Sequence, residues 1–196
     1  PQNEEARAEA DLLMQVQYHI TTPKNGLNVV GCIQDAITGN YLLTKEGMFK
    51  KEEAINLLIS IGIDDSSYFK KLKEKVSGKE LFSTILPNDF DFIGSSKNPV
   101  RENKSSDVVI KKGQLVEGVI DQATIGGERG SLVRALYVRY GEEKCLDVLG
   151  KASLLGVAYL LKRGFSTGVA DTDLPAKTYL KCDEVIEEAF KEVQLV

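Results

Sequence analysis

The segment from Gly26 to Thr44 constrains the fold most. It begins with a short apolar run, Val29 to Ile33, which is typical of a buried strand. The polar pair Gln34 and Asp35 follows, and apolar residues at helical spacing come next. We therefore predict a strand, a turn and a helix whose first turn carries Gln34 and Asp35. A polar pair at such a junction often points into a cleft, where a helix N-terminus favours anionic ligands.

Length and composition bound the class of protein. The 196 residues fit one domain, or one domain with an appendage. Hydrophobic residues make up 42% of the chain, which is enough to form a core and argues against wholesale disorder. The net charge is −4 and the isoelectric point is near 5.2, which argues against broad, nonspecific binding to nucleic acid.

The cysteines indicate an intracellular protein without a zinc site. Cys32, Cys145 and Cys182 are far apart, no CxxC pair occurs, and His19 is the one histidine. We predict reduced cysteines, no metal site, no membrane association and a cytoplasmic location, because no apolar run is long enough to span a bilayer and no signal peptide precedes the first helix. The chain begins with Pro1 rather than Met, so we expect an excised fragment.

Apolar spacing predicts most of the helices. Asn3 is a candidate N-cap for the first of them. Gly141 separates two of the later helices, and Gly164 ends the second of these. We expect Val185, Ile186, Ala189 and Phe190 of the last helix to point inward. The predicted helical ranges are 3–17, 51–61, 78–86, 131–140, 142–163 and 183–193.

A β-hairpin is predicted between residues 108 and 120. Two β-branched runs flank the turn Lys111–Gly113, which is a typical hairpin pattern. The preceding residues, 94–106, are polar and rich in turn formers, and they predict an exposed loop. The expected fold class is therefore α+β, with several helices packed on a small, mostly antiparallel sheet.

Several blocks of the sequence resemble the largest subunit of multisubunit DNA-directed RNA polymerases, most closely the archaeal A′ form. In this family, residues similar to 1–14 form the helix that follows the catalytic aspartate loop. The other similar blocks are 26–44, 78–87, 109–127 and 164–168. The resemblance implies three parts: the helix after the aspartate loop at 1–18, the pore domain at 19–165, and the start of the funnel domain at 166–196.

The resemblance also implies a function. In the family, this region lines the secondary channel, through which nucleoside triphosphates enter and backtracked RNA is extruded. The implied partners are the other polymerase subunits, DNA, RNA, nucleoside triphosphates and a transcript cleavage factor that reaches through the pore. Mg²⁺ belongs to the intact enzyme and is held by residues outside this chain, so we expect no catalytic residue and no bound cofactor here.

The segment Pro87 to Phe92 looks like a metal site but fits a structural role better. Asp89 and Asp91 are two residues apart, and two carboxylates on an extended segment can share a divalent cation. The family's catalytic loop reads Asn-Ala-Asp-Phe-Asp-Gly-Asp, however, and the third aspartate is missing here. Phe90 and Phe92 alternate as in a strand with one apolar face. We therefore interpret the segment as a strand.

Six residues are candidates for the nucleotide path: Gln34, Asp35, Arg129, Ser166, Thr167 and Asp171. For Gln34 and Asp35, the alternative is a pair that caps the following helix. Asp171, together with Asp173, would otherwise make turn hydrogen bonds. We also predict that Gln34 and Asp35 lie on the same face as the segment 164–171.

Arg129 lies in a Gly-rich loop, Gly126 to Ser131, that precedes a predicted helix. The loop lacks the Lys-Ser/Thr pair of a P-loop, so a tight connection with Ser131 near the N-cap is the default interpretation. Gln122 and Ala123 stand where some relatives carry a lysine pair, which weakens the case for direct contact with nucleotide at this point.

Two other functions compete with the polymerase interpretation. The first is a free-standing acidic scaffold that docks other proteins, and it predicts an extended apolar surface patch. The second is a metal-dependent phosphotransferase, and it predicts a third carboxylate close to Asp89 and Asp91. A fragment of a large assembly should in turn expose apolar side chains on its first and last helices.

Overall fold

The computed structural model describes residues 2–96, 107–173 and 175–194. The chain divides into two compact units, Pro1–Arg163 and Gly164–Val196. The first unit contains the sheets and most of the helices, and the second contains a 3₁₀ turn and one long helix. The expected α+β class is confirmed, with two small antiparallel sheets among the helices of the first unit.

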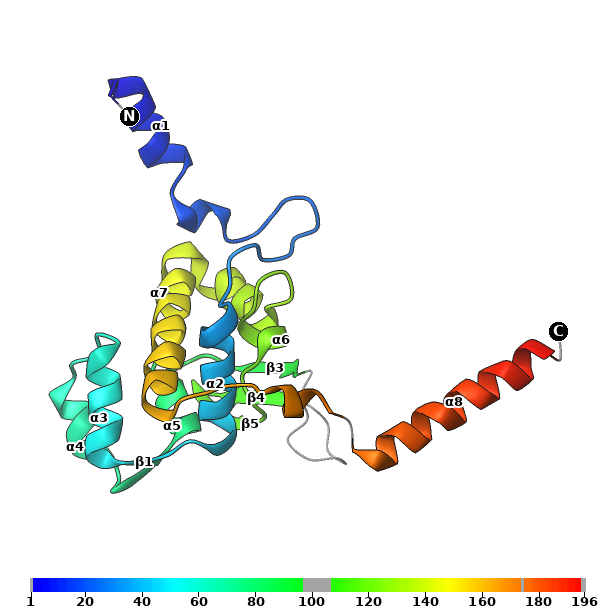
Figure 1. Ribbon diagram of the computed structural model, residues 1–196. Helices are drawn as coiled ribbons and strands as arrows, with labels where there is room; N and C mark the ends of the chain where they lie inside the picture. The colour runs from blue at the N-terminus through cyan, green and yellow to red at the C-terminus, as the bar shows by residue number, and fades with distance from the viewer. Residues whose placement is uncertain (1, 97–106, 174, 195–196) are drawn as a thin grey trace. The chain divides into compact units, whose positions relative to one another are not determined.

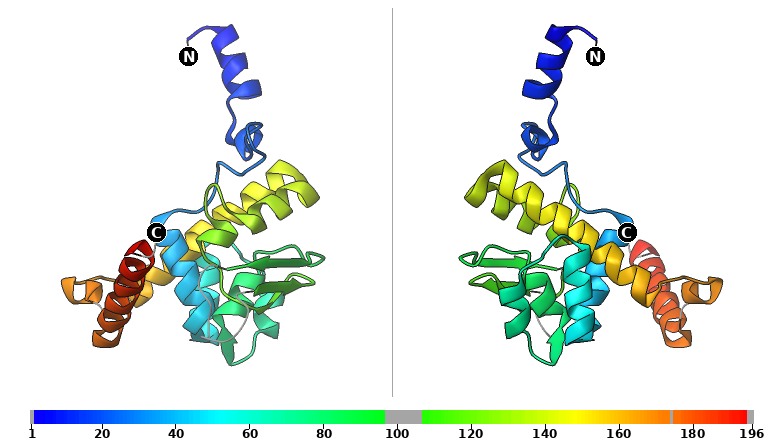
Figure 2. Two further views of the ribbon diagram at one scale, coloured as in Figure 1. Left: turned by 90° about the vertical axis from the view of Figure 1, so that its right-hand side faces the viewer. Right: turned by 90° about the vertical axis from the view of Figure 1, so that its left-hand side faces the viewer.

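Two helices that lie side by side form the centre of the first unit: α2 (Gln34–Glu46) and α7 (Ser131–Arg163) (Figures 1 and 2). The helix backbones approach closely at two glycines. A Cβ atom on Gly39 would lie 2.0 Å from the carbonyl oxygen of Gly156. The buried Asn40 amide donates across this contact to the Ala152 carbonyl oxygen, at 2.7 Å. The two glycines and the hydrogen bond from Asn40 therefore fix the place at which α2 crosses α7.

A three-stranded sheet contains the predicted hairpin. It has the strand order β3 (Phe92–Ser95), β4 (Asp107–Lys111) and β5 (Gln114–Glu117), with antiparallel neighbours. Lys112 and Gly113 both have positive φ, at 49° and 70°, as in the type I′ turns that match the twist of a hairpin. The inward side chains of the strands join the core, and the short helix α6 (Gln122–Ile125) follows.

A second, two-stranded ribbon forms a lobe with three helices. β1 (Met48–Lys50) pairs with β2 (Lys75–Ser77). The helices of the lobe are α3 (Lys51–Ser60), α4 (Ser66–Lys71) and α5 (Gly78–Ser83). Ser77 and Glu80 form a capping box at the start of α5, in which each side chain bonds the other residue's backbone N–H. The predicted helices at 51–61 and 78–86 are thus present, although α5 ends at Ser83.

The predicted break at Gly141 is a sharp bend inside α7. Gly141 has φ 78° and ψ −173°, a conformation that is almost restricted to glycine. The Cys145 thiol donates to the Val133 carbonyl oxygen at 3.4 Å, although the two residues are twelve apart in sequence. A straight helix would hold them about 18 Å apart. The bend therefore folds the first arm of α7 against the second.

The N-terminal segment differs in part from the prediction. α1 (Glu4–Leu13) begins at the predicted N-cap, where the Asn3 side chain accepts from the Ala6 N–H at 2.9 Å. The helix ends at Leu13 rather than at residue 17, because the His19 ring nitrogen binds the Leu13 carbonyl oxygen at 2.8 Å and a 3₁₀ helix, η1 (Val16–His19), follows. α1 buries no residue.

Two further expectations are wrong. The run Val29 to Ile33 is not a buried strand. Its pairing with the rest of the described chain as a strand is one isolated bridge, between Cys32 and Gly126. In addition, Val29 and Ile33 are 61% and 69% exposed. The predicted loop at 94–106 begins inside a strand, since β3 extends to Ser95. The rest of that loop, residues 97–106, lies outside the described residues.

The second unit contains η2 (Val169–Thr172) and α8 (Ala176–Gln194). α8 starts earlier than the predicted range of 183–193. Its apolar side chains are exposed rather than inward, including Val185, Ile186 and Phe190 at 53–66%. The exposed apolar side chains expected on the first and last helices are thus present, because α1 also exposes Leu12 and Leu13. Across the described residues, no helix combines the length and apolar content that crossing a membrane requires.

Candidate functional site

Two of the predicted site segments meet at one junction. The Cys32 N–H donates to the Ile125 carbonyl oxygen at 2.8 Å, and the Glu128 N–H donates to the Asn28 carbonyl oxygen at the same distance. The buried Asn28 amide also donates to the Gly126 carbonyl oxygen. The loop 126–130 therefore lies against segment 28–32, directly before α2, and this contact brings Arg129 to the part of the fold that carries Gln34 and Asp35.

Gln34 and Asp35 are both exposed at the start of α2. Gln34 has φ 43°, a left-handed conformation that is uncommon outside glycine. The N-cap of α2 is Ile33, which has no capping side chain, and neither polar side chain forms a hydrogen bond with a described residue. The capping alternative therefore has no support, and both side chains are available to solvent.

The Gly-rich loop is a tight connection, as the default interpretation held. Arg129 is exposed, and Glu128 has φ 63°. Ser131 does not cap α7: it is the first residue of the helix, and its hydroxyl donates to the Ala123 carbonyl oxygen at 3.1 Å. A Cβ on Gly31 would lie 2.4 Å from Gly126, so the segments pack backbone to backbone.

The remaining candidates belong to the second unit. Ser166, Thr167 and Asp171 are exposed. The Asp171 carboxylate accepts from the Gly168 N–H at 2.7 Å, which stabilises the first turn of η2. The turn interpretation of Asp171 is thus supported. Convergence of this segment with Gln34 and Asp35 stays a prediction.

Asp89 is bonded to helix α7, and Asp91 is bonded to the hairpin turn. Asp89 accepts from the Tyr140 hydroxyl at 2.9 Å and pairs with Arg139 at 3.3 Å. The hydrogen bond that the Tyr140 hydroxyl donates is the main reason why the pKa of Asp89 is lower than usual. Asp91 accepts from the Lys112 N–H at 2.7 Å. The two carboxylates thus have structural partners, although the strand of this region begins at Phe92 rather than before Asp89.

The third carboxylate that a phosphotransferase would need beside Asp89 and Asp91 is not found among the described residues. Within 2–96, 107–173 and 175–194, no three His, Cys, Asp or Glu side chains gather to hold a metal ion. Burial raises the pKa of both Cys32 and Cys145 to about 11, so the two thiols are protonated at neutral pH and serve as core side chains.

The Asp91→Ala variant tests the phosphotransferase alternative. We expect a loss of about 1 kcal/mol in unfolding free energy, because the Lys112 N–H loses its acceptor. Added Mg²⁺ should change the melting temperature of neither wild type nor variant. Asp64→Ala is the control, since the exposed Asp64 side chain has no hydrogen bond to a described residue. Tight Mg²⁺ binding by calorimetry that disappears in Asp91→Ala alone would support the phosphotransferase.

One polar residue at the junction was missed by sequence reasoning. Arg134 follows the Gly-rich loop by one helical turn, and its backbone N–H donates to the Gly130 carbonyl oxygen at 3.1 Å. Its side chain is half-buried, and its Nε atom is enclosed without an acceptor among the described residues. The sequence offers no signal for this, because an arginine in a first helical turn is ordinarily solvated.

Comparison with known proteins identifies the family. A family model described as RNA polymerase Rpb1, domain 3, matches residues 19–172. DNA-directed RNA polymerase subunit Rpo1N from Methanocaldococcus jannaschii is 36% identical over 99% of this chain and 15% of that protein. Rpo1N from Methanococcus vannielii is 35% identical over 99% of this chain and 23% of that protein.

A eukaryotic relative agrees with the archaeal ones. DNA-directed RNA polymerase III subunit RPC1 from Bos taurus is 32% identical over 95% of this chain and 16% of that protein. The chain spans less than a quarter of each of these three relatives. The family match, by contrast, runs from the end of η1 through α2, the sheets and α7 to η2. The chain therefore belongs to the family of DNA-directed RNA polymerase largest subunits, and its residues 19–172 correspond to Rpb1 domain 3.

Proposed function

We propose that the chain is a piece of the largest subunit of a DNA-directed RNA polymerase and takes part in transcription within the assembled, cytoplasmic enzyme. The observation that carries this proposal is the family match over residues 19–172. In this proposal, 1–18 is the helix after the aspartate loop, 19–165 is the pore domain, and 166–196 begins the funnel domain. Nucleotidyl transfer and its Mg²⁺ use residues outside this chain, so the isolated chain does not extend RNA.

The junction's role is to line the secondary channel. Gln34, Asp35 and Arg129 are exposed polar side chains on two segments that hydrogen bonds hold together. Exposed polar side chains on segments that backbone hydrogen bonds hold in place are typical of residues that line a ligand path. The exposed Ser166, Thr167 and Asp171 of the second unit are further candidates for the nucleotide path. The path carries nucleoside triphosphates inward and admits backtracked RNA and a cleavage factor beside the DNA-bound active centre.

The scaffold alternative rests on the exposed apolar side chains of α8. A polymerase fragment exposes the same side chains where neighbouring parts of the enzyme cover them. The α8 surface therefore fits both functions, and the family match favours the polymerase.

Gln34→Ala in the assembled polymerase tests the channel role. A lost hydrogen bond to the triphosphate costs about 1 kcal/mol, so we expect about a fivefold rise in the triphosphate concentration for half-maximal elongation. Elongation rates over a triphosphate titration measure this. Gln114→Ala is the control, because Gln114 is exposed on β5, outside the junction. An unchanged half-maximal concentration, or a loss of assembly, would contradict the channel role of Gln34.

A further inference from the structure

Asn28 holds the Gly-rich loop in place, and only 1% of its surface is exposed. Its side-chain amide donates to the Val30 carbonyl oxygen at 2.9 Å and to the Gly126 carbonyl oxygen at 2.8 Å. Carbonyl oxygens are acceptors, so these two neighbours determine which atom of the amide is the nitrogen. The backbone carbonyl oxygen of Asn28 accepts from the Glu128 N–H at 2.8 Å. Asn28 therefore binds the loop at two points, one on each side of Gly127.

The segment that carries Asn28 is itself fixed to the core. Thr21 and Asn28 form an isolated antiparallel bridge. The Val29 N–H donates to the carbonyl oxygen of Ile20 at 2.8 Å, and Ile20 is fully buried. The hydrogen bonds of Asn28 therefore connect the Gly-rich loop to the buried core of the first unit.

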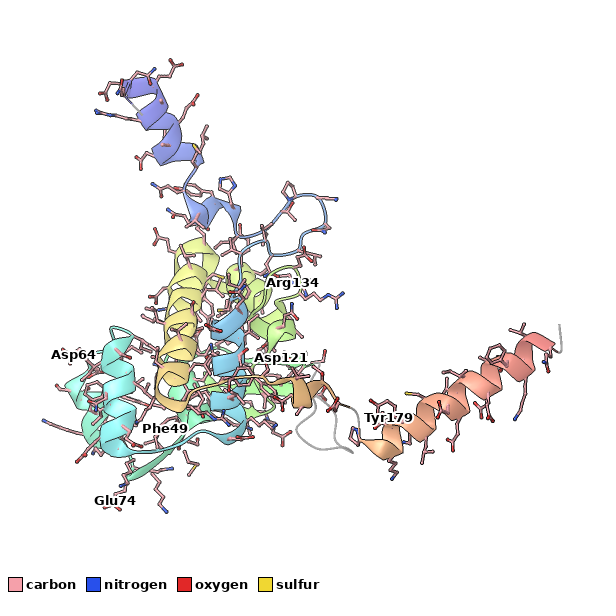
Figure 3. The ribbon with its side chains drawn as sticks, viewed as in Figure 1. Phe49, Asp64, Glu74, Asp121, Arg134 and Tyr179 are labelled. Atoms are coloured by element: carbon pink, nitrogen blue, oxygen red, sulfur yellow. The ribbon has the colours of Figure 1, made fainter. Side chains whose placement is uncertain are left out.

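The loop is packed closely where Asn28 contacts it. A Cβ atom on Gly130 would lie 2.9 Å from the Asn28 amide nitrogen and 2.5 Å from the Gly126 carbonyl oxygen. The Arg134 N–H donates to the Gly130 carbonyl oxygen at 3.1 Å, so the first turn of α7 holds the end of the loop (Figure 3 labels Arg134). Arg129 lies between these attachments and is exposed. Its backbone is thus fixed on both sides, whereas its side chain is in solvent.

An arginine on a fixed loop suits the binding of a phosphate group. A guanidinium matches two phosphate oxygens with parallel hydrogen bonds, which requires a defined orientation. A loop that first has to be ordered costs conformational entropy on binding, and a fixed loop avoids this cost. Hydrogen bonds in the interior are stronger than those in water. The buried bonds of Asn28 therefore fix the loop more firmly than surface bonds would.

We propose that Asn28 is a positioning residue for the binding of nucleoside triphosphate: it fixes the Gly-rich loop so that Arg129 is held beside the start of α2 for contact with the triphosphate. Asn28 is buried, so it acts through Arg129 and does not touch the nucleotide itself. This inference rests on the proposed function, because it takes the triphosphate as the ligand of the junction. It adds a buried residue to the exposed ones that line the path.

Asn28→Asp in the assembled polymerase tests the proposal. Aspartate has nearly the same shape as asparagine, but it has no donor when ionised and one donor when protonated. An oxygen would then face the carbonyl oxygens of Val30 and Gly126. We expect the half-maximal triphosphate concentration for elongation to rise about fivefold and the maximal rate to stay within about twofold of wild type. Asn28→Leu removes both donors without adding a charge and should give a similar rise.

Asn25→Asp is the matched control, because it makes the same chemical change in the same segment. Asn25 is exposed, and its side-chain oxygen accepts from the Leu27 N–H at 3.1 Å. Aspartate keeps this acceptor, so the half-maximal triphosphate concentration should stay at the wild-type value. A rise as large as that in Asn28→Asp would assign the effect to the added negative charge and overturn the proposal.

A double variant tests whether Asn28 acts through Arg129. Arg129→Met removes the exposed guanidinium and should raise the half-maximal triphosphate concentration about tenfold, with assembly intact. Adding Asn28→Asp to Arg129→Met should raise the concentration by less than about twofold more, because the loop no longer has an arginine to place. A residue that only stabilises the fold would add its full effect to that of Arg129→Met.

The possible outcomes separate the inference from the proposed function. If neither Gln34→Ala nor Arg129→Met changes the half-maximal triphosphate concentration, the proposed channel role fails, and the inference fails with it. If both raise it and the two Asn28 variants do not, the inference alone fails. Additive effects in the double variant would make Asn28 a structural residue and overturn the inference. A loss of assembly in both Asn28→Asp and Asn28→Leu would lead to the same conclusion.

Discussion

Gly39→Ala is expected to destabilise the first unit by about 3 kcal/mol, because overpacking a close helix contact forces the backbones apart. The new Cβ would lie 2.0 Å from the Gly156 carbonyl oxygen and 2.7 Å from its Cα, and neither atom can move away by a change of rotamer. The higher helix propensity of alanine offsets at most about 1 kcal/mol of this loss in unfolding free energy. Urea unfolding followed by circular dichroism measures the loss.

Gly150→Ala is the control for this substitution. Gly150 lies on α7 as well, but a Cβ there would have no heavy atom within 4 Å. The variant should therefore be stabilised, by up to about 1 kcal/mol, through helix propensity alone. Equal effects of the two substitutions would show that the α2–α7 contact does not depend on the missing side chain at Gly39.

Thr44→Val is expected to cost about 2 kcal/mol. The buried Thr44 hydroxyl on α2 donates to the Asn40 carbonyl oxygen at 2.8 Å and accepts from the Ile120 N–H at 3.0 Å. Valine has nearly the same shape but no hydroxyl, so the buried Ile120 N–H is left without an acceptor. Denaturant unfolding gives the global loss, and hydrogen exchange of the Ile120 amide should become faster.

Thr38→Val provides the same chemical change on the same helix. Thr38 is partly exposed, and its hydroxyl makes no hydrogen bond with a described residue. Its replacement should change the unfolding free energy by less than about 0.5 kcal/mol. A comparable loss in both variants would mean that the Thr44 contribution comes from helix propensity and not from its bond to Ile120.

Local signals in the sequence predicted several elements correctly. Asn3 caps α1 with its own side chain, and the turn at Lys112 and Gly113 takes the two positive φ values that a short hairpin needs. Gly141 breaks α7 where the helical pattern is interrupted by glycine. In each case, residues close in sequence supply the interaction, so the pattern and its cause lie within the same few positions.

Long-range contacts decided the cases in which sequence reasoning failed. Val29 to Ile33 has the composition of a strand, but a strand needs a partner, and loop 126–130 offers one bridge. The apolar side chains of α8 keep helical spacing, yet they are exposed within the described residues. Composition reports what a segment can bury, whereas the neighbours that the fold supplies determine what it does bury.

The candidate site divides in the same way. The resemblance to polymerase largest subunits and the exposed pair Gln34 and Asp35 were accessible from sequence, and the family is confirmed. The sequence by itself determined most of the longer helices, the hairpin, the break at Gly141 and the family, but not the short helices α4 and α6. The tertiary structure alone decided the contact of Gly39 with Gly156, the hydrogen bond from Ile120 to Thr44 and the enclosure of the Arg134 Nε atom. These depend on groups far apart in the chain, whose proximity no local pattern encodes.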